Sequence, residues 1–143
     1  MWFVTGALSL LGRMMVVAVF LFALVGHGVS QFTDVAAKMT AKGIPAASAA
    51  LVVGMIVLVV GCVLVVLGYY TRLGALLLLL LLGGVTATFC DYWTIQDEVL
   101  RAAEAVHFMQ NVAIAGALVF LLANGGGAWS LDSCAAETDD ELV

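Results

Sequence analysis

Charged residues are scarce in this chain of 143 residues: they make up 10% of it, whereas 64% of the residues are hydrophobic. Soluble domains carry about 25% charged and roughly 45–50% apolar residues. The few charges also fall between apolar blocks, so the predicted helices lack the polar stripe that a soluble bundle presents to water. This composition excludes a water-soluble fold and indicates that lipid is the solvent.

The sequence also lacks the motifs of common catalytic and redox sites. It contains no P-loop, no H-E-x-x-H and no Ser-His-Asp pattern. Its three cysteines, Cys62, Cys90 and Cys134, form no C-x-x-C pair, and the predicted topology keeps them too far apart for an intramolecular disulfide. No charge is expected deep inside a span, so the usual mark of an ion or proton pathway is missing.

Four apolar segments are long enough to cross a bilayer as helices, which takes about 20 residues each. They cover residues 7–26, 44–68, 73–89 and 107–124. Arg13 interrupts the first segment, and we expect its side chain to reach the headgroups. A signal peptide is the alternative for this segment, but no clear small-x-small cleavage site follows it.

The fold class that follows is an all-α membrane protein, an antiparallel bundle of four transmembrane helices. A single membrane domain is expected over residues 1–132. Residues 133–143 form an acidic tail without apolar anchors, which we expect to be disordered and solvated.

Two longer loops are expected on one side of the membrane and one tight turn on the other. In the first loop, Phe32, Val35 and Met39 recur at helical spacing, which predicts a short interfacial helix; an ordered polar loop is the open alternative. In the third loop, residues 97–107 carry charges at helical spacing and predict a second short helix. Aromatic and basic residues near the span ends are the predicted interfacial anchors: Arg13, Tyr69, Tyr70, Arg72, Trp93 and Trp129.

Small residues in the second span predict how the helices pack. Ala47, Gly54, Gly61 and Gly68 recur every seven residues, and Ala50 lies four residues before Gly54. Helices in a bilayer associate through close van der Waals contact, which a stripe of small side chains permits. The seven-residue period favours left-handed crossings.

Four spans place both termini on one side of the membrane. The basic residues are divided almost evenly between the two sides of the membrane. Arg13 and Arg72 lie with the termini, and Lys38, Lys42 and Arg101 lie opposite. Acidic residues contribute little to this rule, and we expect cytoplasmic termini in a prokaryotic inner membrane.

Short segments at the span ends carry a family resemblance. They are Gly12-Arg13, Gly26-His27-Gly28, Lys42-Gly43-Ile44-Pro45, Gly61 with Gly68–Arg72, Ala87-Thr88-Phe89 with Asp91-Tyr92-Trp93, and His107–Asn111 with Trp129–Asp132. In this order and spacing the chain resembles the DoxX family of small four-helix membrane proteins, some of which are subunits of thiosulfate:quinone oxidoreductase. The resemblance implies a redox-linked membrane complex.

The chain departs from that family's pattern at several polar positions. Relatives often carry a glutamate in the second span, where this chain has only Val57-Leu58, and Cys90 and Gln110 stand where histidine and lysine are frequent. Proton-coupled quinone chemistry needs an acid or base within hydrogen-bond reach. The departures therefore favour a supporting subunit over independent catalysis, although an enzymatic role stays open.

The preferred function is an accessory or anchoring subunit, with the lipid bilayer, other membrane or membrane-associated proteins and a second copy of the chain as partners, and no nucleic acid. The alternative is a quinone-interacting subunit, whose headgroup site would be formed by His27, Tyr92, Trp93, His107, Gln110 and Asn111. A small transporter ranks third. No intrinsic cofactor or metal site is expected, because the spacing of the histidines specifies none.

Overall fold

The computed structural model describes residues 2–44, 46–89, 95–127 and 129–131, and of Trp2, His27 and Gly28 it describes the backbone alone. The elements in chain order are α1 (Trp2–Ala23), the π-helix η1 (Leu24–Val29), α2 (Phe32–Ala41), α3 (Ala47–Leu67), α4 (Thr71–Phe89) and α5 (Glu98–Asn124). The described residues contain no strand. The predicted all-α membrane bundle is confirmed, because four of these helices are long and apolar enough to span a bilayer.

These segments form helices because the hydrocarbon core of a bilayer offers no hydrogen-bond partners. The backbone N–H and C=O groups must therefore bond to one another. This requirement overrides the modest helix propensity of the valines that fill α3. Glycine in the left-handed conformation closes α3 at Gly68, where φ is 67°. At the start of α5, the Asp97 carboxylate accepts hydrogen bonds from the backbone N–H groups of Val99 and Leu100, at 2.9 and 3.1 Å.

The spans differ from the predicted ones mainly at two ends. The first candidate span is Phe3–Gly26, longer than the predicted 7–26, and the last is Glu98–Asn124, longer than the predicted 107–124. The helix predicted in the first loop is α2. The helical turns predicted for the third loop are the first turns of α5 itself, because no helix breaker separates Glu98 from the apolar stretch that follows.

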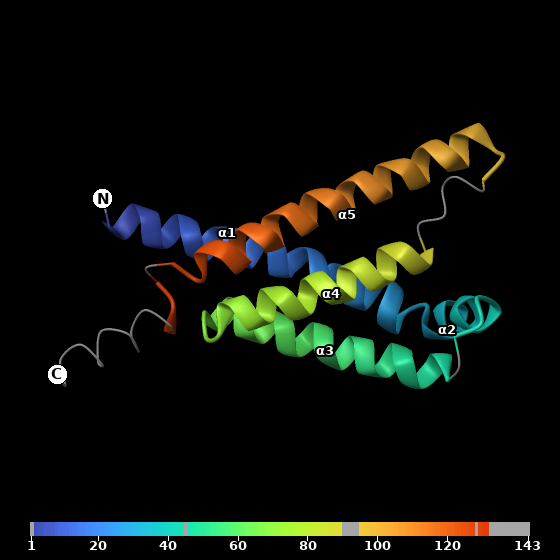
Figure 1. Ribbon diagram of the computed structural model, residues 1–143, viewed down its shortest axis with the longest axis horizontal. Coiled ribbons are helices and arrows are strands. Elements are labelled where there is room, and N and C mark those ends of the chain that lie inside the picture. Colours follow the sequence, from blue (N-terminus) through green and yellow to red (C-terminus); the bar gives the residue numbers. More distant parts are fainter. Residues whose placement is uncertain (1, 45, 90–94, 128, 132–143) are drawn as a thin grey trace.

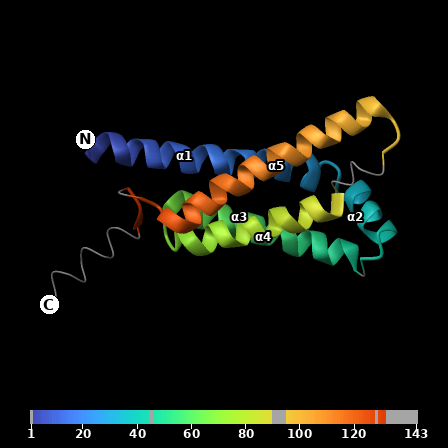
Figure 2. The same ribbon diagram turned by 45° about the horizontal axis from the view of Figure 1, so that its top comes forward.

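The helices pack as a hairpin with two flanking partners (Figures 1 and 2). α3 and α4 are antiparallel neighbours, α5 packs on α4, and α1 packs on α3. One core joins all four spans: Val17 and Phe20 of α1, Cys62 and Val65 of α3, Ala75, Leu78 and Leu82 of α4, and Leu118 of α5.

Two helices extend beyond this core in opposite directions. The amino-terminal part of α1 passes the turn between α3 and α4 at one end of the bundle. The amino-terminal part of α5 stands clear of α4 at the other end (Figures 1 and 2). Phe3 packs against Trp129, so the first and last described segments lie at the same end.

Candidate functional site

A buried arginine occupies the end of the bundle where the first and last described segments meet. The Arg13 side chain has no exposed surface. Its Nη2 donates to the backbone carbonyl of Trp129, and its Nε donates to the carbonyl of Ser9 at 3.4 Å. The sequence predicted that this side chain would extend to the headgroups. It turns inward instead, because backbone carbonyls at this end of the bundle accept its hydrogen bonds.

The chain after α5 forms a strap over this arginine; we define the strap as the described residues of 125–131. The Ser9 hydroxyl donates to the carbonyl of Gly126 at 2.9 Å, which ties the strap to α1. The Ser130 hydroxyl donates to the carbonyl of Gly127 at 2.7 Å. A Cβ on Gly126 would lie 2.6 Å from the Cβ of Ser130 and 2.7 Å from the Oγ1 of Thr71. The strap is therefore packed tightly against the start of α4.

Cations lie at the carboxyl ends of three helices. Arg13 lies beside Gly68, which closes α3. Arg72 Nη2 donates to the carbonyl of Ala123 in the last turn of α5, at 3.3 Å, and Lys42 Nζ donates to the carbonyl of Thr88 in the last turn of α4. Positive charge at these positions offsets the negative end of the helix dipole. Three of the five basic residues thus support the fold itself.

The other predicted anchors lie near the same end. Tyr69 and Tyr70 are exposed in the turn between α3 and α4 and stack edge to face, with ring centroids 4.7 Å apart. The Trp129 ring is 39% exposed and packs edge to face on Phe3, with centroids 5.8 Å apart. Trp93 lies outside the described residues. The anchoring roles stay predictions.

The residues predicted for a quinone headgroup fall into separate groups. Tyr92 and Trp93 lie outside the described residues, and of His27 only the backbone, within η1, is described. His107 and Gln110 are exposed and three residues apart on α5, which places them on one face of that helix. Asn111 points elsewhere, because its Nδ2 donates to Thr86 Oγ1 of α4 at 3.0 Å. The quinone site stays a prediction.

We predict that the bond between Asn111 and Thr86 stabilises the contact of α5 with α4. Replacing Asn111 by alanine should lower the free energy of unfolding by about 1 kcal/mol, the magnitude typical of hydrogen bonds between helices in a membrane. Thermal unfolding in lipid nanodiscs measures this. Asn124→Ala is the control, because the Asn124 side chain donates to the Phe120 carbonyl of its own helix, at 2.9 Å. Equal midpoints for the two variants would contradict the prediction.

The residues predicted to pack the helices lie at different depths. Ala47, Gly61 and Gly68 are buried, Gly54 is half-buried with Leu81 as its nearest neighbour, and Ala50 is exposed. Gly61 approaches Gly74 of α4 closely. A Cβ on Gly61 would lie 3.4 Å from the carbonyl oxygen of Gly74, and one on Gly74 would lie 3.1 Å from that of Gly61. Sequence reasoning missed Gly74, although it is an isolated glycine within a leucine-rich span.

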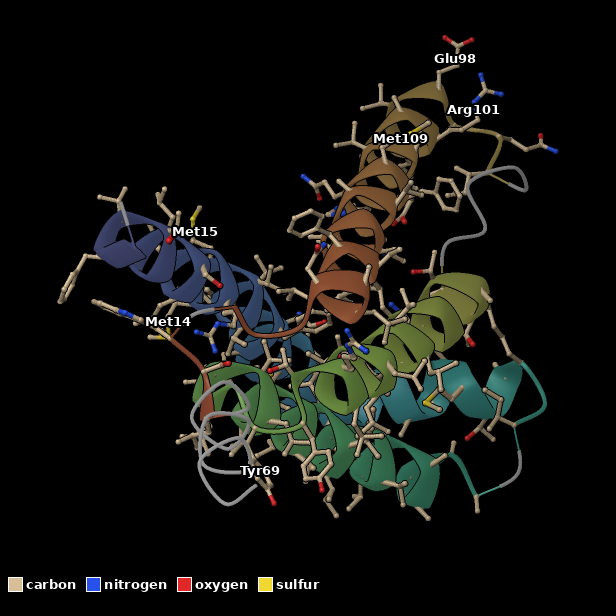
Figure 3. The ribbon with its side chains drawn as sticks, turned by 60° about the vertical axis from the view of Figure 1, so that its left-hand side comes forward. Met14, Met15, Tyr69, Glu98, Arg101 and Met109 are labelled. Atoms are coloured by element: carbon tan, nitrogen blue, oxygen red, sulfur yellow. The ribbon has the colours of Figure 1, made fainter. Side chains whose placement is uncertain are left out.

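The outer face of α5 is the least covered surface of the four spans. Only 6% of the residues in the 18-residue apolar stretch of α5 are buried, against 17–22% in the corresponding stretches of the other three spans. A shallow hollow of about 400 Å³ lies on this face. It is lined by Ala105, Val106, Met109, Gln110 and Ala113. Figure 3 shows Glu98, Arg101 and Met109 on the part of α5 that stands clear of α4.

Neither a metal-binding cluster nor a deep ligand cavity marks the described residues. No three His, Cys, Asp or Glu side chains gather within the described segments. The hollows found there are open surface depressions with mostly apolar linings. The described helices present a mainly apolar surface to the bilayer.

Comparison with known proteins gives a family and a relative. A model of the SURF4 family matches residues 4–137. The inner membrane protein YphA of Escherichia coli (strain K12) is 32% identical over 94 residues, which span 66% of the chain and 66% of that relative. The matched part is thus just under two thirds of the relative's length. No solved structure matches.

The resemblance to the DoxX family was wrong. The family model that matches is that of SURF4, it covers nearly the whole chain, and no match to DoxX was found. The segments that carried the resemblance were short runs of glycine, aromatic and polar residues at the ends of spans. Such residues recur at the membrane interface for general physical reasons, so their order alone did not identify the family.

Proposed function

The chain belongs to the SURF4 family, and from this premise we propose that it is an accessory or anchoring subunit that binds another integral membrane protein through the outer face of α5. The observation that carries the proposal is the low burial of α5 beside its three neighbours. The occupant is a transmembrane helix of the partner. The SURF4 match lends no support to the redox link that the earlier resemblance implied.

The composition of this face suits a protein helix. Ala105 and Ala113 are among the residues that line the hollow, and nothing lies within 4 Å of the Cβ position of Gly116 on the same helix. Small side chains let two helices approach closely, which is the main source of helix association in lipid. The exposed Gln110 amide adds a group that can form a hydrogen bond between helices.

The charges at the start of α5 extend this surface beyond the apolar part of the bundle. Glu98 and Arg101 are exposed and Glu104 is half-buried, and they alternate in sign along the helix. Such a pattern favours a partner that carries charges next to its own span, since complementary charges fix the register of a contact.

The membrane and the orientation belong to the same proposal. The relative's name supports an inner-membrane location. Four spans put both termini on one side, and we assign that side to the cytoplasm.

Photo-crosslinking in living cells tests the proposed contact. A benzophenone amino acid at position 109 should yield an adduct with one membrane protein of defined mass, because Met109 is 65% exposed and lines the hollow. The same amino acid at position 80 is the matched control, since Leu80 of α4 is also 65% exposed. Position 80 should give lipid adducts.

Two outcomes would contradict the proposal. Lipid adducts alone at position 109 would show that α5 faces the bilayer as α4 does. An adduct of twice the mass of the chain would assign the face to a second copy and remove the need for a different partner.

A further inference from the structure

The first half of α1 extends past the end of the bundle. Arg13 lies beside Gly68, which closes α3, so the helix from Trp2 to Gly12 continues beyond the end of its neighbour. These eleven residues add about 16 Å at 1.5 Å per residue. Figures 1 and 2 show this part of α1 beyond the turn that joins α3 to α4.

This extension presents an apolar surface. It contains no charged residue, and the hydroxyl of Ser9 bonds to the strap. Phe3, Val4, Leu8 and Leu11 are 57–70% exposed. Beside them lies a groove of about 420 Å³. Its lining is Phe3, Val4, Ala7, Leu8, Leu11 and Trp129.

The apolar lengths of the helices do not match one another. α3 has 21 residues and α4 has 19, which correspond to about 31 and 28 Å and fit a hydrocarbon core of about 30 Å. α1 continues into η1, and Trp2 to Val29 correspond to about 42 Å. The side of the molecule formed by α1 therefore requires a thicker apolar layer than the side formed by α3 and α4.

We propose that a lipid acyl chain occupies the groove beside Trp129, and that the protein prefers a bilayer thicker than α3 and α4 alone require. Leu11, Met15 and Phe22 follow one another at intervals of four and seven residues, so the groove lies on the same face of α1 as Met15 and Phe22, which are 64% and 80% exposed. Figure 3 shows Met15 on this helix. An acyl chain suits this lining because its residues are apolar or aromatic, and the polar contacts of Ser9 and Arg13 are made to backbone carbonyls of the strap. Bilayers adapt to such a mismatch by local thickening or tilt of the helix.

Fluorescence quenching tests the occupant. In a variant with Trp2→Phe and Trp93→Phe, Trp129 is the only tryptophan. Phosphatidylcholine brominated along its acyl chains should quench Trp129 strongly, and aqueous iodide should quench it weakly. Strong quenching by iodide, without quenching by brominated lipid, would place the groove in water and overturn the proposal. Protection from both quenchers would mean that protein covers the groove, which also overturns it.

Bilayer thickness tests the second part. In vesicles of phosphatidylcholine with myristoleoyl, oleoyl or erucoyl chains, the thermal midpoint should rise with chain length up to the longest. Leu8→Ser together with Leu11→Ser should shift the optimum to a shorter chain. The control pair, Val59→Ser with Val63→Ser in α3, should lower the midpoint in every bilayer without moving the optimum. An optimum in the shortest lipid, or one that the Leu8 and Leu11 changes leave in place, would contradict the proposal.

Discussion

Replacing Arg13 by methionine is expected to lower the free energy of unfolding by about 3 kcal/mol, because hydrogen bonds from a charged donor contribute roughly 1.5–3 kcal/mol each. Methionine fills a similar volume but donates nothing to the carbonyls of Ser9 and Trp129. The positive charge beside the end of α3 is lost as well. The free energy of unfolding of Arg13→Lys should lie between those of the unmodified protein and Arg13→Met. An ammonium keeps the charge but cannot reproduce the geometry of the guanidinium.

Thermal unfolding in nanodiscs measures the loss, and thiol labelling localises it. A cysteine at position 130, with the native cysteines replaced by serine, should react slowly because Ser130 is only 6% exposed. With Arg13→Met added, the strap should open and labelling should become fast. The control is Arg101→Met, since Arg101 is exposed on α5. Slow labelling and an unchanged midpoint in the Arg13 variant would show that the strap holds without the arginine.

Replacing Gly61 by valine is expected to cost about 3 kcal/mol, at the upper end of the usual penalty for overpacking. A Cβ at this position would lie 2.8 Å from Leu78 Cγ and 2.9 Å from Leu78 Cδ2, so the Leu78 side chain or the two helices would have to shift. Leu78 is fully buried and belongs to the core shared by the four spans. The loss should therefore affect the whole bundle.

A double variant separates this clash from other effects. Leu78→Ala alone should destabilise the protein by leaving a cavity. Combined with Gly61→Val, it should cost clearly less than the sum of the single changes, since the alanine removes the atoms in conflict. Gly83→Val is the control, because nothing lies within 4 Å of a Cβ on Gly83. Additive losses, or an equal loss for Gly83→Val, would show that the contact at Gly61 is not tight.

The bundle could be predicted from sequence because a bilayer leaves few alternatives. Apolar runs of the right length specify helices, and the short Tyr69–Arg72 connection specifies the α3–α4 hairpin. The short helix α2 was predicted from the recurrence of Phe32, Val35 and Met39. The start of α5 was placed too late, because charged residues at Glu98 and Arg101 hide the continuity of the helix.

The environment of Arg13 could not be predicted in the same way. Its acceptors are backbone carbonyls, and one of them belongs to a residue 116 positions away. No side-chain type reveals such a partner, so Arg13 was interpreted as an anchor in the headgroups. Gly74 escaped notice because a single glycine has no periodic companion, although it faces Gly61 across a close contact between α3 and α4.

Isolation of the native complex tests the accessory-subunit proposal most directly. The chain should be extracted from its membrane in native nanodiscs and compared with the variant Ala113→Phe, which fills the hollow on α5. Mass spectrometry should find one membrane protein in stoichiometric amount with the unmodified chain, and that protein should be lost from the variant while the bundle still folds. A chain that is isolated alone, or a partner that the variant retains, would contradict a docking role for α5.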